Sequence, residues 1–435
     1  MTAKWKLAGP LAAAVAFTVL APLQAQADSD RDDDYLGKPA AIQLDQRPLY
    51  LVDGMDAGPL KDRLMQCRGG PFRRTDFSIG HRGAALQFPE HTKESYVAAA
   101  RQGAGIVECD VTFTSGGALV CRHAENDLHT TTNILKTPLA SSCVKPFSPA
   151  VIDANGVVVT PASAECRASA ITLAQFRTLT GKMDAFNRAA RTVDEYLGGT
   201  APWRTDLYTG RGTLMSFRDS IELNRALGVR HTPELKGGDP AKIALVFGSQ
   251  RNYALKFAAE LRDAGVKPRD VWPQSFNVDD VLVWIDETEY GRQAVYLLDY
   301  DAAANDIVIQ PPYDAMPRAD YFRMLQQRGV RIIAPPMPAL LGVDAGGRVV
   351  PSPLARSLKA MGFDVITWTF ERSDLRGGAS KAGYYYDFDP TGAAIRKDSD
   401  MYKALDVLAR EVKILGIFSD WPATVTYYAN CMGLK

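Results

Sequence analysis

Two histidines stand at the ends of short apolar segments, where their side chains could take part in acid–base chemistry. The sequence contains five histidines, and His81 ends the apolar run at 77–81 while His123 ends the run at 118–123. An imidazole suits general acid–base catalysis because its pKa lies near neutrality. We therefore expect His81 and His123 to be catalytic. We expect His91, His129 and His231 to be hydrogen-bonded structural residues.

Three acidic residues have the spacing of ligands for a divalent cation. Glu108 and Asp110 are two apart in an apolar segment at 105–113, so their carboxylates would point to the same face of a strand. Two carboxylates on a buried face repel each other strongly unless a cation such as Mg²⁺ or Ca²⁺ neutralises them. Glu234 can be the third ligand. Lys236 would share its face, so the alternative for Glu234 is a plain ion pair with Lys236.

Further polar and aromatic residues at predicted strand ends are candidates for substrate contacts. Arg82 directly follows the first strand, and a guanidinium is a natural bidentate clamp for phosphate. Glu90 could bind a ligand hydroxyl or orient Arg82, unless it is an ordinary acidic residue at a helix start. Gln274 and Trp368 could wall a pocket. Asp420 closes the last strand and could support the site or cap a helix.

The segments that position these residues alternate between short apolar strands and amphipathic helices. This alternation predicts a parallel sheet, and about eight units in one chain favour a closed (β/α)8 TIM barrel of the α/β class. In such a barrel the carboxyl ends of the strands face the active site, where the candidate residues fall. Strands are predicted at 77–81, 105–113, 118–123, 231–236, 270–276, 294–299, 331–336, 364–370 and 414–420.

Residues 124–230 interrupt the alternation after the third predicted strand. The segment is much longer than the usual βα loop of about 2–6 residues, so we expect a long insertion over one face of the barrel. Residues 107–123 alone fit an antiparallel pair, with a hairpin turn at 115–117. We expect residues 49–435 to form one barrel domain that includes this insertion.

The first 48 residues are typical of an export signal and a linker. Two lysines, an apolar run at 11–20 and the sequence Ala25-Gln26-Ala27 predict a signal peptide over 1–27 that is cleaved near Ala27. A charged stretch over 28–48 predicts a disordered acidic leader. The apolar run is shorter than the ~20 residues of a membrane span, so we expect no stable membrane insertion. We expect a periplasmic or extracellular protein.

The charge balance and the cysteines further limit the class of protein that this chain can be. The chain has 50 Lys+Arg and 50 Asp+Glu, which argues against a nucleic-acid-binding surface, and nothing in the sequence implies a protein partner. Six cysteines in an oxidising compartment predict up to three disulfides, for which 15 pairings are possible. The preferred set is Cys109–Cys121 across the hairpin, Cys143–Cys166 within the insertion and Cys67–Cys431 between the chain ends.

Taken together, these motifs resemble the glycerophosphodiester phosphodiesterase family. The resemblance spans about residues 77–427, and the insertion is typical of larger secreted members. It implies a (β/α)8 barrel that hydrolyses glycerophosphodiesters, as small-molecule substrates, to glycerol 3-phosphate and an alcohol with one divalent cation. The motifs that carry it are HRG (81–83), PEHT (89–92), GIVECDVTFTSGGALVCRH (105–123), PELK (233–236) and GIFSDWP (416–422).

The resemblance also implies roles for individual residues. Glu108, Asp110 and Glu234 correspond to the metal ligands, His81 and His123 to the acid–base pair, and Arg82 and Lys236 to the phosphate ligands. The chain departs from the family pattern at Ala124, where an Asp is common, and at 129–131, where Arg-Thr-Thr is common. Both departures lie outside the ligand set, so they bear on substrate preference.

Three alternatives remain open at the level of sequence. The first is a phospholipase of the sphingomyelinase D kind that acts on intact choline lipids. The second is a secreted, non-catalytic binding protein on the same barrel, which would require loss of a catalytic residue. The third is a structural envelope protein with a stabilising cation site, which would leave the two strand-end histidines unexplained.

Overall fold

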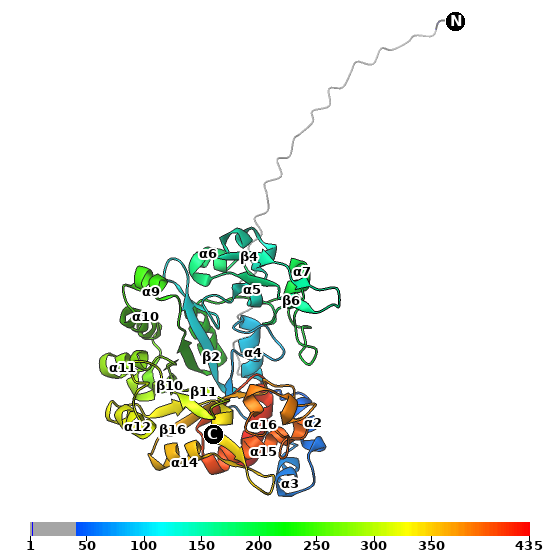
Figure 1. Cartoon of the computed structure of the whole chain (residues 1–435), viewed down its shortest axis with the longest axis vertical. Helices are drawn as coiled ribbons and strands as arrows, with labels where there is room; N and C mark the ends of the chain where they lie inside the picture. Colours follow the sequence, from blue (N-terminus) through cyan, green and yellow to red (C-terminus); the bar gives the residue numbers. More distant parts are fainter. Residues whose placement is uncertain (1, 3–40) are drawn as a thin grey trace. The chain divides into compact units, whose positions relative to one another are not determined.

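The central feature of the fold is a closed barrel of parallel strands (Figure 1). Nine strands form one sheet, and eight of them pair in parallel. The barrel is closed because the last of these eight strands in the chain pairs with the first. This confirms the predicted (β/α)8 barrel. In order around the barrel the strands are β1 (Thr75–Gly80), β2 (Ala104–Phe113), β8 (Arg230–Leu235), β9 (Gln274–Ser275), β10 (Val295–Leu297), β13 (Ile332–Ala334), β16 (Asp364–Phe370) and β17 (Gly416–Ser419).

The computed structural model describes residue 2 and residues 41–435. The rest of the predicted signal peptide and residues 28–40 of the predicted leader lie outside the described residues. Within the leader's predicted range, Leu44 and Pro48 are buried and α2 (Arg47–Gly54) begins at Arg47, so this part of the leader is ordered on the barrel domain. No helix in the described part of the chain combines the length and the hydropathy of a membrane span.

Helices surround the barrel, and most of the longer ones bury one face while the other is exposed. A glycine with a positive φ follows the last helical residue by two positions in the helices Gln250–Asp263 and Arg318–Gln327. At these glycines, Gly265 and Gly329, the left-handed conformation favours a residue without Cβ. The helices of this ring are α4 (Lys93–Arg101), α8 (Phe217–Leu227), α9 (Pro240–Phe247), α10 (Gln250–Asp263), α11 (Val278–Glu287), α12 (Arg318–Gln327), α13 (Met337–Leu340), α14 (Pro353–Ala360), α15 (Met401–Asp406) with a π-helical continuation (Val407–Val412), and α16 (Pro422–Met432).

The third predicted strand is the second strand of the predicted hairpin. It forms β3 (Leu119–Cys121), which pairs antiparallel with β2 and therefore is not a barrel strand. The predicted hairpin is confirmed, and the insertion follows the second barrel strand and its hairpin. The last part of the predicted insertion, α8, packs against β2 and β8 and so belongs to the helix ring. The reason is that 217–227 has the amphipathic pattern of a barrel helix, with Ile221 and Leu223 buried.

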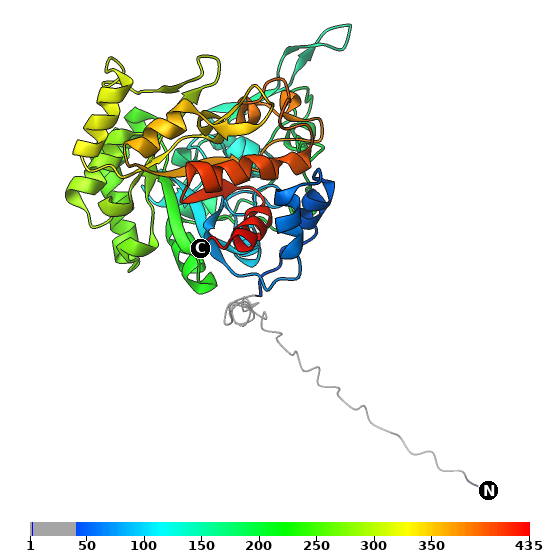
Figure 2. The ribbon, with the colours of Figure 1, turned by 90° about the horizontal axis from the view of Figure 1, so that it is seen from below.

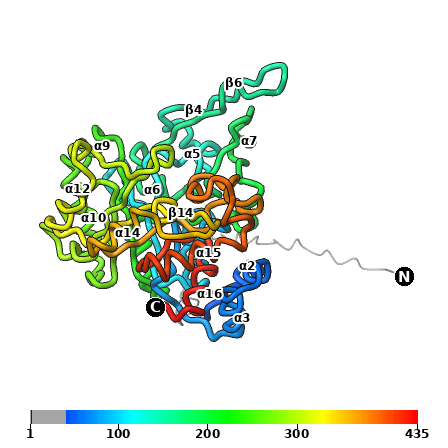
Figure 3. The backbone as a smooth tube through the Cα atoms, turned by 60° about the horizontal axis from the view of Figure 1, so that its bottom comes forward, coloured from blue at the N-terminus to red at the C-terminus, as the bar shows by residue number. Residues whose placement is uncertain are grey.

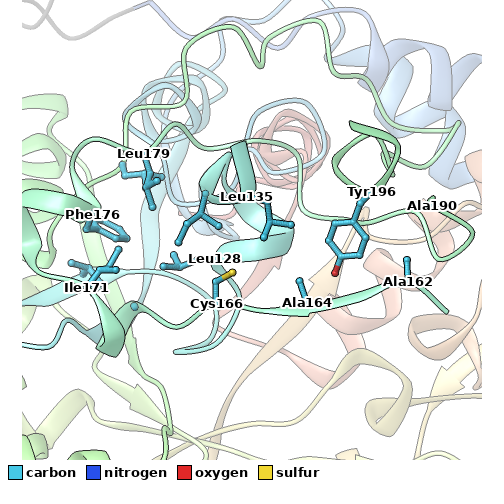
Figure 4. Close-up of a cluster of buried hydrophobic side chains, with 14 residues drawn as sticks. Leu128, Leu135, Ala162, Ala164, Cys166, Ile171, Phe176, Leu179, Ala190 and Tyr196 are labelled. Atoms are coloured by element: carbon cyan, nitrogen blue, oxygen red, sulfur yellow. The ribbon is translucent and has the colours of Figure 1, made fainter. Parts of the chain in front are cut away.

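The insertion has its own hydrophobic core, shown in Figure 4. Leu128, Ile134, Phe176 and Tyr196 are buried in it, and Val120 of β3 joins it to the barrel. The β5–β6 ribbon extends outward at the tip of the insertion (Figure 3). The elements of the insertion are α5 (Leu128–Thr131), β4 (Lys145–Ser148), β5 (Val151–Ile152), β6 (Val158–Thr160), β7 (Ser163–Glu165), α6 (Leu173–Phe176) and α7 (Val193–Leu197).

All three preferred disulfides are present: Cys67–Cys431, Cys109–Cys121 and Cys143–Cys166. The first joins the residue after α3 (Pro59–Gln66) to α16, and Figure 2 shows the red α16 beside the blue α2 and α3. Two small antiparallel pairs complete the fold, β11 (Asp299–Asp301) with β12 (Asp306–Val308) and β14 (Leu341–Val343) with β15 (Val349–Pro351).

Candidate active site

A cavity of about 540 Å³ lies at the carboxyl ends of the barrel strands. Residues from six barrel strands contribute to it, together with residues that directly follow barrel strands and residues of the insertion. The barrel side supplies His81, Arg82, Glu90, Glu108, His123, Glu234, Lys236, Gln274, Phe276, Leu297, Trp368, Arg372, Tyr385 and Phe418, and the insertion supplies Asp127, Thr130, Thr131, Asp184, Ala185 and Phe186. Nine of the ten predicted site residues line it directly, and the tenth, Asp110, is buried with its Oδ2 3.5 Å from Nε of Arg82.

The three predicted metal ligands converge. Glu108, Asp110 and Glu234 each offer a carboxylate oxygen, and these oxygens lie within 4.8 Å of one another. The register explains this, because Asp110 of β2 pairs directly with Glu234 of β8 and Glu108 precedes Asp110 by two residues on the same face. All three side chains are buried.

The chemistry of this donor set fits a hard divalent cation. Asp110 Oδ1 is buried and has no hydrogen-bond partner among the described residues, which is costly for a carboxylate oxygen. Carboxylate oxygens at this spacing are the ligands that Mg²⁺ and Ca²⁺ prefer. Gln274 Nε2 donates to Glu108 Oε1 at 2.9 Å, so Gln274 orients this carboxylate.

The pKa values reflect the crowding of negative charge. Burial, followed by the charges of Asp110 and Glu234, raises the pKa of Glu108 well above its usual range, and burial raises the pKa of Glu234 to about 7. Burial would also raise the pKa of Asp110, but Lys236 and His91 hold it well below its ordinary value. A bound cation would favour the ionised form of all three carboxylates.

Lys236 and Arg82 bring positive charge to the same cavity. Lys236 Nζ lies 2.6 Å from Glu234 Oε1, so the ion pair considered from the sequence exists beside the acidic cluster. Arg82 Nη1 donates to Glu90 Oε2 at 2.7 Å, which gives Glu90 the orienting role suggested as one alternative. The backbone N–H of Arg82 donates to Glu108 Oε2 at 2.9 Å, linking this arginine to the acidic cluster.

His81 is held in one orientation by Asp420. Its Nδ1 lies 2.5 Å from Asp420 Oδ1, and its Nε2 lies 3.7 Å from Glu108 Oε2. Burial lowers the pKa of His81 to about 4, although Asp420 opposes this, so the ring is neutral at pH 7. Because an ionised carboxylate can only accept, Nδ1 carries the proton and Nε2 is the free acceptor. Asp420 therefore supports the site; it does not cap α16.

His123 reaches the cavity from the end of the β2–β3 hairpin. The preceding residue, Arg122, is fully buried and fixes this segment: its backbone N–H donates to the Asp110 carbonyl, and its guanidinium donates to the carbonyls of Cys121 and Glu90. Burial, followed by the charge of Arg82, lowers the pKa of His123 well below its ordinary value. The two predicted catalytic histidines thus share one cavity although they come from different strands.

Trp368 belongs to an aromatic wall. Its ring packs edge-on against Phe276 and Tyr385, with centroid distances of 5.7 and 6.2 Å, and its Nε1 donates to the Ala334 carbonyl at 2.9 Å. This side of the cavity offers apolar surface to the part of a ligand that lies beyond its charged group.

Sequence reasoning did not identify three residues that shape the site. His91, expected to be structural, is buried with Nε2 2.9 Å from Asp110 Oδ2, so it also orients a predicted metal ligand. Arg372 donates hydrogen bonds to Asp420 and to Asp184 of the insertion. The position of Arg372 two residues after a barrel strand is a signal that could have indicated it. No spacing pattern points to Asp184. His129 and His231 lie outside the cavity lining, as expected.

Fold and site define a (β/α)8 barrel hydrolase of phosphoric diesters. Residues 81–424 match the model of the glycerophosphoryl diester phosphodiesterase family, and the chain belongs to that family. It is 39% identical over 254 residues to an extracellular protein of Arthroderma benhamiae, covering 58% of this chain and 100% of that protein. It is 22% identical over 223 residues to a glycerophosphodiester phosphodiesterase of Arabidopsis thaliana, covering 51% of each. A crystal structure from Silicibacter pomeroyi, named for the same family, is similar with a TM-score of 0.52 at 20% identity, covering 86% and 98% of the two chains.

Proposed function

We propose that this protein hydrolyses glycerophosphodiesters to glycerol 3-phosphate and an alcohol, with one divalent cation held by Glu108, Asp110 and Glu234. The observation that carries the proposal is the convergence of these carboxylates, within 4.8 Å of one another, beside the cavity that His81 and His123 line. Membership of the family supports the same reaction. Mg²⁺ and Ca²⁺ both suit an all-carboxylate site.

The arrangement of the residues supports a division of labour between the two histidines. His81 has its Nδ1 proton directed to Asp420, so its Nε2 is the base that removes the proton from the attacking hydroxyl. The family resemblance makes this hydroxyl the glycerol 2-hydroxyl, which forms a cyclic phosphate as the alcohol leaves. His123 is then the acid that protonates the departing alkoxide, and the negative charge of the bound phosphate favours the protonated ring that this role requires. In the second half of the reaction a water opens the cyclic phosphate with the histidine roles reversed.

Arg82 and Lys236 hold the phosphate in this scheme. Both cationic groups line the cavity beside the acidic cluster, so they can bind the non-bridging oxygens and stabilise charge that develops on them. A bound divalent cation would add charge stabilisation on the same oxygens. Glu90 fixes Arg82 by their 2.7 Å bond, while Trp368 contacts the organic part of the diester.

We further propose that residues 49–435 act as one catalytic domain and that the insertion limits the size of the substrate. Asp127, Thr130, Thr131 and Phe186 line the cavity from the insertion. We also propose that the protein is exported, with cleavage near Ala27. The name of the Arthroderma benhamiae relative supports this, as do three disulfides, which persist in oxidising compartments.

A substrate panel tests the proposal against the lipid alternative. Purified mature protein is given glycerophosphocholine in solution, sphingomyelin vesicles or lysophosphatidylcholine micelles, with Mg²⁺ or Ca²⁺ present. We expect glycerol 3-phosphate and choline from the first substrate and at least about tenfold slower choline release from the lipids. Faster turnover of the lipids would favour a phospholipase. No turnover of any diester, together with tight binding of one, would favour a binding protein.

A further inference from the structure

Arg372 connects the catalytic histidine to the insertion. Its Nη1 donates to Asp420 Oδ2 at 2.8 Å, and its Nη2 donates to Asp184 Oδ2 at 2.9 Å. The same Nη2 lies 3.9 Å from Glu90 Oε2. The side chain of Arg372 is 19% exposed, whereas that of Asp420 is 1% exposed, so the pair is largely shielded from water.

The two oxygens of Asp420 have separate partners. Oδ1 accepts a hydrogen bond from His81 Nδ1, and Oδ2 accepts one from Arg372 Nη1. A carboxylate held at both oxygens cannot rotate, so Arg372 fixes the plane in which Asp420 meets the imidazole. Burial would raise the pKa of Asp420, but Arg372 and then His81 lower it, which keeps the carboxylate ionised. Without Arg372, Asp420 would be a buried charge held from one side.

The far end of Arg372 is fixed by the insertion. Asp184 Oδ1 accepts a hydrogen bond from Arg204 Nη2 at 2.6 Å, and the same Nη2 donates to the carbonyl of Ala85 at 2.6 Å. Ala85 lies four residues after His81. The hydrogen bonds therefore form a closed chain of contacts. It starts and ends in the segment after β1, at His81 and Ala85, and passes through Asp184 and Arg204 of the insertion.

The backbone before Arg372 is also anchored. Glu371 has a φ of 64°, an unusual value for a residue other than glycine, and its buried carboxylate accepts from Arg47 Nη2 at 2.6 Å and from the Thr424 hydroxyl. These contacts fix the backbone directly before Arg372 and so help to fix the orientation of its side chain.

We propose that Arg372 is a positioning residue, which orients His81 through Asp420 and is itself set in place by Asp184 of the insertion. The inference rests on the proposed diesterase function and adds a requirement to it: the insertion is needed for chemistry as well as for substrate selection. Arg372 lines the cavity, so the competing role is direct binding of the substrate phosphate.

Steady-state kinetics separate these two roles. For Arg372→Ala we expect kcat with glycerophosphocholine to fall at least about tenfold with KM within about threefold, because an interaction that orients the base acts on the chemical step. Arg372→Lys keeps the charge and should recover part of kcat. The control Arg376→Ala removes an exposed ion pair with Asp374 in the same segment and should leave both constants unchanged. A rise in KM with unchanged kcat would overturn the proposal.

A readout independent of turnover covers the case in which the diesterase assignment fails. A proton in a hydrogen bond as short as His81 Nδ1 to Asp420 is expected far downfield in the ¹H NMR spectrum, and it should vanish in His81→Ala. We expect this signal to move or broaden in Arg372→Lys and in Asp184→Asn. The Asp184→Asn variant keeps Arg372, so it tests the contact even if Arg372→Ala does not fold. An unchanged signal in both variants would overturn the positioning role. A changed signal in a protein without diesterase activity would leave it standing and refute the proposed function alone.

Discussion

Nδ1 of His81 lies 2.5 Å from Oδ1 of Asp420, and this contact joins the first barrel strand to the last across the β1–β17 pair that closes the barrel. The contact fixes both the ring orientation and the tautomer of His81. It therefore decides which nitrogen can act as a base.

Replacing the carboxylate tests this relationship. In Asp420→Asn the side-chain amide can donate to Nδ1, which would place the imidazole proton on Nε2 and remove the free acceptor. We expect kcat to fall by about 10²-fold to 10⁴-fold, as in other histidines with an orienting carboxylate. The measurement is glycerol 3-phosphate release at saturating glycerophosphocholine, with circular dichroism to verify the fold. Turnover close to that of the unchanged protein would show that the tautomer is not controlled by Asp420.

The acidic cluster predicts metal-dependent stability. Adding Mg²⁺ or Ca²⁺ after EDTA treatment should raise the free energy of unfolding by about 2.7 kcal/mol at a hundred times Kd, since the folded state alone brings the three carboxylates together. Glu108→Gln should weaken cation binding at least about tenfold in titration calorimetry. The same variant should be more stable than the unchanged protein in EDTA at pH 7, because the raised pKa of Glu108 costs folding free energy above the ordinary pKa of a glutamate and a glutamine has no such cost. Equal cation affinity in both proteins would place the ion elsewhere.

Asp127 in the cavity wall predicts a dependence of stability on pH. Burial raises the pKa of Asp127 to about 6 from an ordinary 3.8, so the folded state binds this proton more tightly than the unfolded state. The contribution to stability is therefore fully present below pH 4, is lost as the pH rises toward 6, and stays lost above it. The size is about 3 kcal/mol. Asp127→Asn does not titrate, so its free energy of unfolding relative to the unchanged protein should rise by that order between pH 4 and 7. A flat difference in denaturant titrations would contradict the prediction.

The disulfides should differ in their effect on stability. Cys67–Cys431 closes a loop with a sequence separation of 364 residues, and Cys109–Cys121 closes one of 12. Because a longer loop restricts the unfolded chain more, replacing both cysteines of the first pair by serine should cost roughly 5–6 kcal/mol, against about 3 kcal/mol for the second. Denaturant unfolding of the two double variants measures the order. A smaller loss for Cys67–Cys431 would mean that the chain ends are already restrained when unfolded.

Much of the fold and most of the candidate site could be predicted because their signals are local. His81, Arg82, Glu108 and Asp110 lie within or directly after apolar segments, and strand periodicity alone sets which side chains share a face. The hairpin over 107–123 could be predicted for the same reason, since its turn residues at 115–117 mark it, and β3 does pair antiparallel with β2.

The parts that could not be predicted depend on tertiary contacts. The bond between Arg372 and Asp184 joins residues 188 positions apart, and no periodicity links them. His91 looked structural because its role arises from its distance to Asp110 across the barrel mouth, which only the folded chain defines. Helix α8 was assigned to the insertion because an amphipathic pattern predicts a helix but does not show which strands that helix packs against.

The most direct test of the account is glycerol 3-phosphate release from glycerophosphocholine by the purified mature protein, measured with EDTA and again after Mg²⁺ or Ca²⁺ is restored. We predict that release stops with the chelator and returns with one of the two cations, and that His123→Ala reduces the restored rate at least about 100-fold. Release that continues unchanged in EDTA, or a His123→Ala variant with the full rate, would contradict the claim that this cavity is a metal-dependent diesterase site.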